Sequence, residues 1–369
     1  MKVLLTLLMW VILPLSVLWK AVVTGGVGYL FYRKRRLRDS SRITTPGGVD
    51  SLDRVVLGGI RQWILVRGED RLKPVLLFLH GGPGVPEGPL VRHYNRRLEE
   101  AFVVVHWDQR GAGKSFSMGI PKESMRLEQF VTDTCELARL LGERFGQDRV
   151  FLVGHSWGSA VGILAAQRCP QFFHAFAGVG QAVDFARGGE VAYRHAVQAA
   201  REQGLTRWAR RLERIGPPPY RGLAGIWRAR QLRSMLFRSG GVAYGETDEA
   251  RYLWKLLKLY LLAPDYSLVD LGRLVWGTVF SMRLLGADLH ELDLVRRVPR
   301  LDLPVYFLAG RHDRVTPSEL VEEYHGALAA PRKSLIWFER SAHSPHLEEP
   351  DRFAEILVSI ALGQADGGS

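Results

Sequence analysis

Continuous apolar runs alternate with more polar stretches over most of the chain. A run of this kind is typical of a strand that is buried on both faces of a parallel sheet. Residues 54–66 differ, because apolar and polar positions alternate around Gly58 and Gly59, which predicts an antiparallel hairpin. Residues 127–145 repeat apolar positions at helical spacing. The continuous runs predict buried strands at 75–79, 102–107, 150–153, 176–179, 305–309 and 334–338.

The pattern changes in the segment 184–300. No strand-like run is evident there, and large apolar residues recur at helical spacing, as at Tyr252 and Leu256. The segment is too long for a plain loop. We therefore expect an α/β fold with a mostly parallel sheet. Residues 51–183 and 301–363 would form its core, and 184–300 a helical cap over the carboxyl ends of the strands.

The N-terminal segment, residues 1–32, is long and apolar. Roughly 20 mainly apolar residues suffice to cross a bilayer, and this segment supplies them if Lys20 reaches the interface. A basic stretch at 33–50 follows, which we interpret as a linker on the cytoplasmic side. We expect a membrane anchor with the remaining chain in the cytoplasm. A cleaved signal peptide, and hence a secreted or periplasmic protein, is the alternative.

Composition adds little to this picture. The net charge is +12, but eight basic residues and one acidic residue lie within the first 42 positions, so the remaining chain is only mildly basic. No nucleic-acid-binding motif accompanies the charge, and we expect no nucleic-acid partner. The two cysteines, Cys135 and Cys169, are interpreted as core thiols, with a disulfide as the alternative.

One short motif carries chemistry. Residues 154–158 read GHSWG and lie between the apolar strand at 150–153 and an apolar helix. This context predicts a nucleophile elbow, a tight turn that holds a serine hydroxyl above the edge of a sheet. We therefore expect Ser156 to be a nucleophile. A serine hydroxyl attacks only when a histidine takes its proton and an acid orients that histidine.

Both partners follow strands further along the chain. Asp313 follows the strand at 305–309, and His343 follows the strand at 334–338. The predicted acid is Asp313 rather than Asp184, because it stands in a GxxD position directly after a strand. The predicted base is His343 rather than His346, because of its Ser-Ala-His-Ser loop.

Glycines after the strand at 75–79 suggest donors for an oxyanion. The HGGPG sequence at 80–84 can present a backbone N–H of Gly82, or alternatively of Gly81, and the N–H of Trp157 would be the second donor.

The loop WDQRGAGKS at 107–115 superficially resembles a phosphate loop. That motif would need glycine where Asp108 stands, so we reject nucleotide binding. We expect Asp108 and Arg110 to tie this loop beside the site. No HExxH motif or paired Cys/His spacing occurs, so neither a metal nor a cofactor is expected.

These motifs, with GRHDRVTP at 310–317 and SAHSPHLEEPDRF at 341–353, resemble the proline iminopeptidase branch of the α/β-hydrolase family over 72–180 and 303–362. The resemblance implies an α/β-hydrolase fold, with helices on both faces of the sheet and an inserted cap. It implies Ser156, Asp313 and His343 as the catalytic triad and Gly82 with Trp157 as the oxyanion hole. Enzymes of this branch release an N-terminal proline from short peptides without a metal or cofactor.

The expected function is that of a serine hydrolase acting through an acyl-enzyme. The preferred substrates are small peptides or amides, as for an aminopeptidase, and small apolar esters are the alternative. A non-catalytic binding protein on the same scaffold is a further alternative. The N-terminal segment and the Arg-rich cap depart from the family pattern. No role in binding a substrate amine is assigned to the acidic residues of the cap, Glu190, Glu202, Glu213, Glu246, Asp248 and Glu249.

Overall fold

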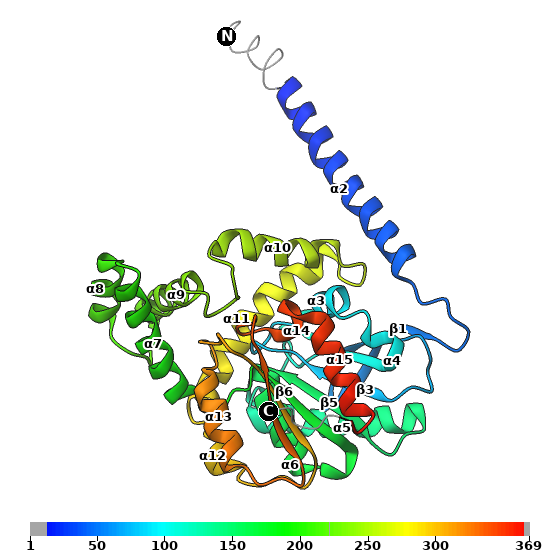
Figure 1. Ribbon diagram of the computed structural model, residues 1–369. Coiled ribbons are helices and arrows are strands. Elements are labelled where there is room, and N and C mark those ends of the chain that lie inside the picture. The colour runs from blue at the N-terminus through cyan, green and yellow to red at the C-terminus, as the bar shows by residue number, and fades with distance from the viewer. Residues whose placement is uncertain (1–12, 221, 365–369) are drawn as a thin grey trace, which may run out of the picture.

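A mostly parallel sheet forms the centre of the molecule (Figure 1). The computed structural model describes residues 13–220 and 222–364. Within them the sheet has eight strands in the order β1-β2-β4-β3-β5-β6-β7-β8; β1, β2 and β4 pair antiparallel and the remaining neighbours pair parallel. The predicted sheet is confirmed. The strands are β1 (Val49–Leu57), β2 (Ile60–Gly68), β3 (Val75–Leu79), β4 (Val103–Asp108), β5 (Val150–His155), β6 (Phe173–Val179), β7 (Val305–Gly310) and β8 (Lys333–Phe338).

Helices cover both faces of the sheet because successive side chains of each strand point to opposite faces. Leu77 of β3 packs in the core shared with α5 and α6, whereas its neighbour Phe78 packs in the core shared with α4 and α15. Both faces are therefore apolar, as the continuous runs predict. The helices around the sheet are α3 (Gly88–Tyr94), α4 (Leu98–Ala101), α5 (Leu127–Phe145), α6 (Trp157–Arg168), α13 (Ser318–Ala327), α14 (Pro345–Glu348) and α15 (Pro350–Ala361).

The segment between β6 and β7 is helical over its described residues. Part of it lies over loops that follow β3 and β4, because Tyr260 donates a hydrogen bond to the Pro86 carbonyl and Lys114 pairs with Asp270 at 2.7 Å. The first three of these helices share a small apolar core of their own. The elements are α7 (Phe185–Glu202), α8 (Thr206–Ile215), α9 (Gly222–Arg238), α10 (Glu249–Leu262), α11 (Leu268–His290) and α12 (Leu294–Arg297).

The predicted membrane anchor is wrong. Residues 1–12 of that segment lie outside the described residues, and α2 (Leu13–Ser41) contains the remainder. No helix within 13–220 and 222–364 is long and apolar enough to cross a membrane. The described part of α2 combines apolar residues with Lys20 and, from Arg33 on, a strongly basic stretch. The predicted location at a membrane, and the membrane as a partner, are corrected accordingly.

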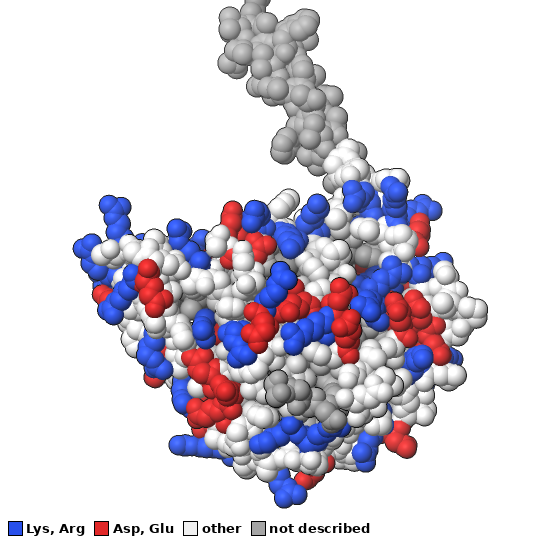
Figure 2. Space-filling view, in the orientation of Figure 1, with Lys and Arg blue, Asp and Glu red and all other residues white. Residues whose placement is uncertain are grey.

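The basic stretch also differs from its predicted role as a linker. Residues 33–41 continue α2, since Arg, Lys and Leu are good helix formers. Figure 2 shows basic side chains gathered around this C-terminal end of α2. The Lys34 ammonium donates to the Tyr266 carbonyl, so the end of the helix contacts the segment between α10 and α11.

The prediction that both cysteines are thiols is also wrong. Cys135 and Cys169 form a disulfide between α5 and the end of α6, with Cα atoms 6.2 Å apart. Both helices pack on the same face of the sheet, which brings the two positions together. Sequence spacing does not show this, because the contact depends on how two helices lie side by side.

We expect the disulfide to stabilise the fold. It closes a loop of 34 residues, and the loop-entropy model assigns such a loop about 3–4 kcal/mol of unfolding free energy. Urea denaturation of the oxidised and the dithiothreitol-reduced wild-type protein measures this without any change of side chain. Cys135→Ala/Cys169→Ala should unfold at the urea concentration of the reduced protein. Equal midpoints for the oxidised and reduced protein would contradict the expectation.

Candidate active site

The turn between β5 and α6 places Ser156 in an unusual backbone conformation. Its φ is 52° and its ψ is −119°, the one positive φ among the described non-glycine residues. The turn is tight: a Cβ on Gly158 would lie 2.2 Å from the Leu79 carbonyl oxygen, and one on Gly154 would lie 2.3 Å from the Gly158 carbonyl oxygen. Only glycine fits at either position. The residue types of the GxSxG pattern are thus required by the backbone geometry.

The structure brings Ser156, His343 and Asp313 together. Ser156 Oγ lies 3.0 Å from His343 Nε2, and His343 Nδ1 lies 3.0 Å from Asp313 Oδ2. These distances are within hydrogen-bond range and form a continuous chain from hydroxyl to carboxylate. The three residues come from the loops after β5, β7 and β8, whose carboxyl ends meet at one edge of the sheet.

The Asp313 carboxylate is held by the turn that follows it. Its Oδ1 accepts hydrogen bonds from the backbone N–H groups of Val315 (2.8 Å) and Thr316 (3.0 Å). The Thr316 hydroxyl lies 2.7 Å from Asp313 Oδ2 and 3.0 Å from the Gly180 carbonyl. Oδ2 therefore remains directed at His343. Sequence reasoning missed Thr316, although its position three residues after the acid, in the sequence DRVT, is typical of a side chain that closes such a turn.

The alternative acid and base lie elsewhere. Asp184 caps the N-terminus of α7 by accepting a hydrogen bond from Arg187 N at 2.8 Å. His346 is fully buried, and its Nε2 lies 4.0 Å from Glu87 Oε2. Asp184 and His346 are thus engaged elsewhere, and the catalytic roles of Asp313 and His343 stay predictions.

The oxyanion donors stay predictions, and two observations favour Gly82 and Trp157. The Gly81 N–H is engaged by Glu87 Oε2 at 3.3 Å, which leaves Gly82 as the better donor of the pair. Trp157 is the first residue of α6, and N–H groups in the first turn of a helix have no acceptor within the helix.

The loop after β4 is tied down as expected. Asp108 accepts hydrogen bonds from Lys114 N (2.8 Å) and the Tyr266 hydroxyl (2.5 Å). Arg110 forms a fully buried ion pair with Asp133 at 3.0 Å. Burial raises the pKa of Asp108 to about 6, although the hydrogen bond from Tyr266 opposes this. The loop is a support for the site, in agreement with the sequence interpretation.

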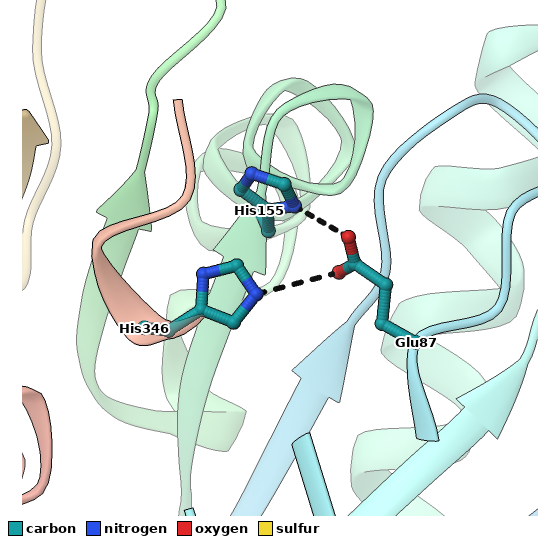
Figure 3. A group of neighbouring side chains, drawn as sticks. All are labelled: Glu87, His155 and His346. Atoms are coloured by element: carbon teal, nitrogen blue, oxygen red, sulfur yellow. Dashed lines mark hydrogen bonds and ion pairs between the residues drawn. The ribbon is translucent and has the colours of Figure 1, made fainter. Parts of the chain in front are cut away.

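A second polar cluster lies directly beneath the site. Figure 3 shows Glu87 beside His155 and His346, with one carboxylate oxygen directed at each ring. Glu87 Oε1 lies 2.7 Å from His155 Nδ1, and His155 Nε2 lies 3.0 Å from the His343 carbonyl oxygen. Sequence reasoning missed Glu87; the available signal was a lone acid in an otherwise apolar and glycine-rich stretch.

The ligand atoms of this cluster lie within 4.8 Å of one another, and a carboxylate with two imidazoles is a set that zinc accepts. However, both nitrogens of His155 already face oxygen acceptors, and the carboxylate lies at direct hydrogen-bond distance from Nδ1. We therefore assign no metal to these residues.

Buried histidines make the fold sensitive to acid. Burial lowers the pKa of His80 to about 4 and the pKa values of His106 and His346 to about 3. An unfolded histidine has a pKa near 6.5. Between about pH 6 and pH 4 these three histidines therefore bind up to three protons more in the unfolded chain than in the folded chain, and Asp108, which is protonated in the folded chain below about pH 6, offsets one of them. The free energy of unfolding should fall by up to about 3 kcal/mol per pH unit on acidification.

Urea denaturation at pH values from 7.5 to 5 measures this slope. His106→Phe should reduce it by about half, since it removes one proton from a net difference of about two. The carboxyl of Glu87 has a pKa of about 2 in the folded chain. It therefore lowers the free energy of unfolding further only at pH values below the ordinary pKa of glutamate. The pKa of His155 is raised in the folded chain. Its contribution to the free energy of unfolding therefore falls as the pH rises, and only above pH 6.5. A free energy of unfolding that is constant between pH 6.5 and 5 would contradict the expectation.

Comparison with known proteins agrees with the fold. The profile of the Alpha/beta hydrolase family matches residues 76–356. The chain is 32% identical to the probable aminopeptidase YbaC of Bacillus subtilis, over 82% of this chain and 93% of that protein. It is 27% identical to the proline iminopeptidase of Heyndrickxia coagulans, over 77% and 88%. The crystal structure of proline iminopeptidase from Mycobacterium smegmatis superimposes with a TM-score of 0.60 at 18% identity, covering 85% of this chain and 98% of that one.

Proposed function

We propose that this chain, which belongs to the alpha/beta hydrolase family, is a serine hydrolase that cleaves amides of small peptides through an acyl-enzyme. One observation carries the proposal: Ser156 Oγ, His343 and Asp313 form a hydrogen-bonded chain at a strand-to-helix turn. The relatives named as aminopeptidases favour an amide substrate with a free amino end.

The geometry supports the following sequence of steps. Ser156 Oγ attacks the substrate carbonyl while its proton passes to His343 Nε2, and Asp313 stabilises the imidazolium that forms. The N–H groups of Gly82 and Trp157 stabilise the negative oxygen of the tetrahedral intermediate. His343 gives the proton to the leaving amine, and the acyl group remains on Ser156. Water then attacks the ester, passes its proton through His343, and releases the acid and the free serine.

The acidic residues of the cap do not supply an obvious amine site. Most of them are engaged locally: Glu213 pairs with Arg201 at 2.5 Å, Glu246 pairs with Arg251 at 3.3 Å, and Asp248 caps α10. Glu249 accepts from Ser234, and Glu202 accepts from Gln198. We therefore propose small peptide amides as the substrates and assign no preference for proline.

Hydrolysis by the full-length protein tests the substrate class. Proline naphthylamide, other aminoacyl naphthylamides and p-nitrophenyl acetate are compared, with Ser156→Ala as the control for each. Ser156-dependent release of naphthylamine supports the proposal. Turnover of the ester alone would replace it with the esterase alternative, and no Ser156-dependent turnover of any substrate would contradict both.

A further inference from the structure

Glu87 touches both halves of the proposed catalytic machinery. One carboxylate oxygen, Oε2, accepts the Gly81 N–H of the oxyanion loop (residues 80–84) at 3.3 Å. The other, Oε1, lies 2.7 Å from His155 Nδ1. His155 in turn reaches the His343 carbonyl oxygen through Nε2 at 3.0 Å. A single carboxylate is thereby linked to the loop that would bind the oxyanion and to the backbone of the proposed base.

The contacts of His155 indicate that its ring is charged. Both ring nitrogens face oxygen acceptors, and only an imidazolium donates from both. Burial opposes this charge, but the Glu87 carboxylate raises the pKa of His155. Burial would likewise raise the pKa of Glu87, yet His155 holds it at about 2. The two acceptors of His155 and its raised pKa thus favour a buried ion pair between Glu87 and His155.

The other titratable groups around the pair leave it intact. His346 and His80 face Glu87, and burial lowers the pKa of each so that both are neutral near pH 7. Asp313 contributes a further negative charge that favours protonated His155, and His343 lies beside the His155 ring with centroids 4.9 Å apart. No second carboxylate among the described residues is in hydrogen-bond contact with His155.

We propose that Glu87, acting through His155, is a positioning residue that holds the oxyanion loop and the backbone of His343 in one fixed arrangement. This inference rests on the proposed function and deepens it. The Glu87–His155 pair joins the oxyanion loop to the backbone of His343. It can hold both segments in place only while all of its hydrogen bonds are present together. A buried pair that loses one member leaves the other uncompensated, which is strongly destabilising.

The substitution Glu87→Leu separates this role from simple space filling, because leucine has a similar size and offers no hydrogen-bond acceptor. The Gly81 N–H and His155 Nδ1 then both lose their partner. Glu87→Gln removes the charge alone, since its amide oxygen can accept from Gly81 while its amide N–H donates to Nδ1 of a neutral His155 that still donates to the His343 carbonyl. Displacements of about 1 Å at a catalytic group can cost about 100-fold in rate.

The rate at which a fluorophosphonate modifies Ser156 in the full-length protein measures this effect without knowledge of the substrate. We expect Glu87→Leu and His155→Gln each to slow modification by about 10- to 100-fold. The double variant should be about as slow as either single variant, because the two side chains act as a unit. With an active substrate, kcat should fall while KM changes little.

A matched control comes from another buried ion pair. Glu99 pairs with Arg67 at 2.7 Å and is 3% exposed, but its contacts are with β2 and not with the site. Glu99→Leu should lower the thermal midpoint and leave the modification rate at the wild-type value. Side-chain ¹⁵N spectra of histidine-labelled protein, assigned with His155→Gln, should show both His155 nitrogens protonated at pH 7.5 in the wild type and not in Glu87→Gln.

The outcomes are distinguishable. A folded Glu87→Leu variant that reacts at the wild-type rate, beside a reactive wild type, would overturn this inference alone. An unreactive Ser156 in the folded wild type would overturn the proposed function and this inference with it. If Glu87→Leu does not fold, His155→Gln carries the same test, and a wild-type rate in that variant would overturn the inference.

Discussion

Replacing Ser156 by alanine is expected to lower kcat by about 10⁴-fold or more on any substrate that the protein turns over. The hydroxyl is the nucleophile of the proposed mechanism, and the remaining groups stabilise an oxyanion that no longer forms on the enzyme. Alanine removes one oxygen atom from a residue that is 9% exposed, so the fold should persist. Steady-state hydrolysis measures the loss, and thermal unfolding checks the fold.

Ser234→Ala is a control for the loss of a hydroxyl. Its side chain donates to Glu249 at 3.0 Å in the helical segment between β6 and β7, away from Ser156. This variant should keep the wild-type kcat. If Ser156→Ala retained more than about a tenth of the wild-type kcat, Ser156 could not be the nucleophile.

Asp313→Asn should lower kcat by about 10⁴-fold, a loss expected when the histidine is held in the wrong tautomer. Two backbone N–H groups, from Val315 and Thr316, point at Oδ1 and will hold the oxygen of the new amide there. The amide nitrogen must then face His343 Nδ1 and donate to it. His343 would carry its proton on Nε2, opposite Ser156 Oγ, and could not act as a base.

Asp184→Asn tests whether the effect is specific to position 313. Asparagine caps a helix about as well as aspartate, so α7 should be unaffected. This variant should have the wild-type kcat and thermal midpoint. Equal losses in Asp313→Asn and Asp184→Asn would contradict the assignment of the acid.

The strands and the candidate site could be predicted from the sequence because their signals are local. A run such as that of β3 is apolar at every position since both faces of the strand are covered. Ser156, Asp313 and His343 are each recognisable because each follows a strand whose carboxyl end lies at the same edge of the sheet. Their hydrogen bonds therefore follow from topology.

Features that depend on packing between distant segments could not be predicted. Cys135 and Cys169 meet because α5 and α6 lie side by side, and neither spacing nor composition encodes that contact. Glu87 contacts His155, 68 residues further along the chain. The N-terminal prediction is contradicted by a different finding, since no helix among the described residues, α2 included, is long and apolar enough to cross a membrane.

Covalent modification of the full-length wild-type protein by a fluorophosphonate probe, followed by peptide mass mapping, tests the central claim most directly. The account predicts one adduct per chain, on Ser156, and none in Ser156→Ala. A folded wild-type protein that stays unmodified, or that carries its adduct on another residue, would contradict the assignment of Ser156 as the nucleophile.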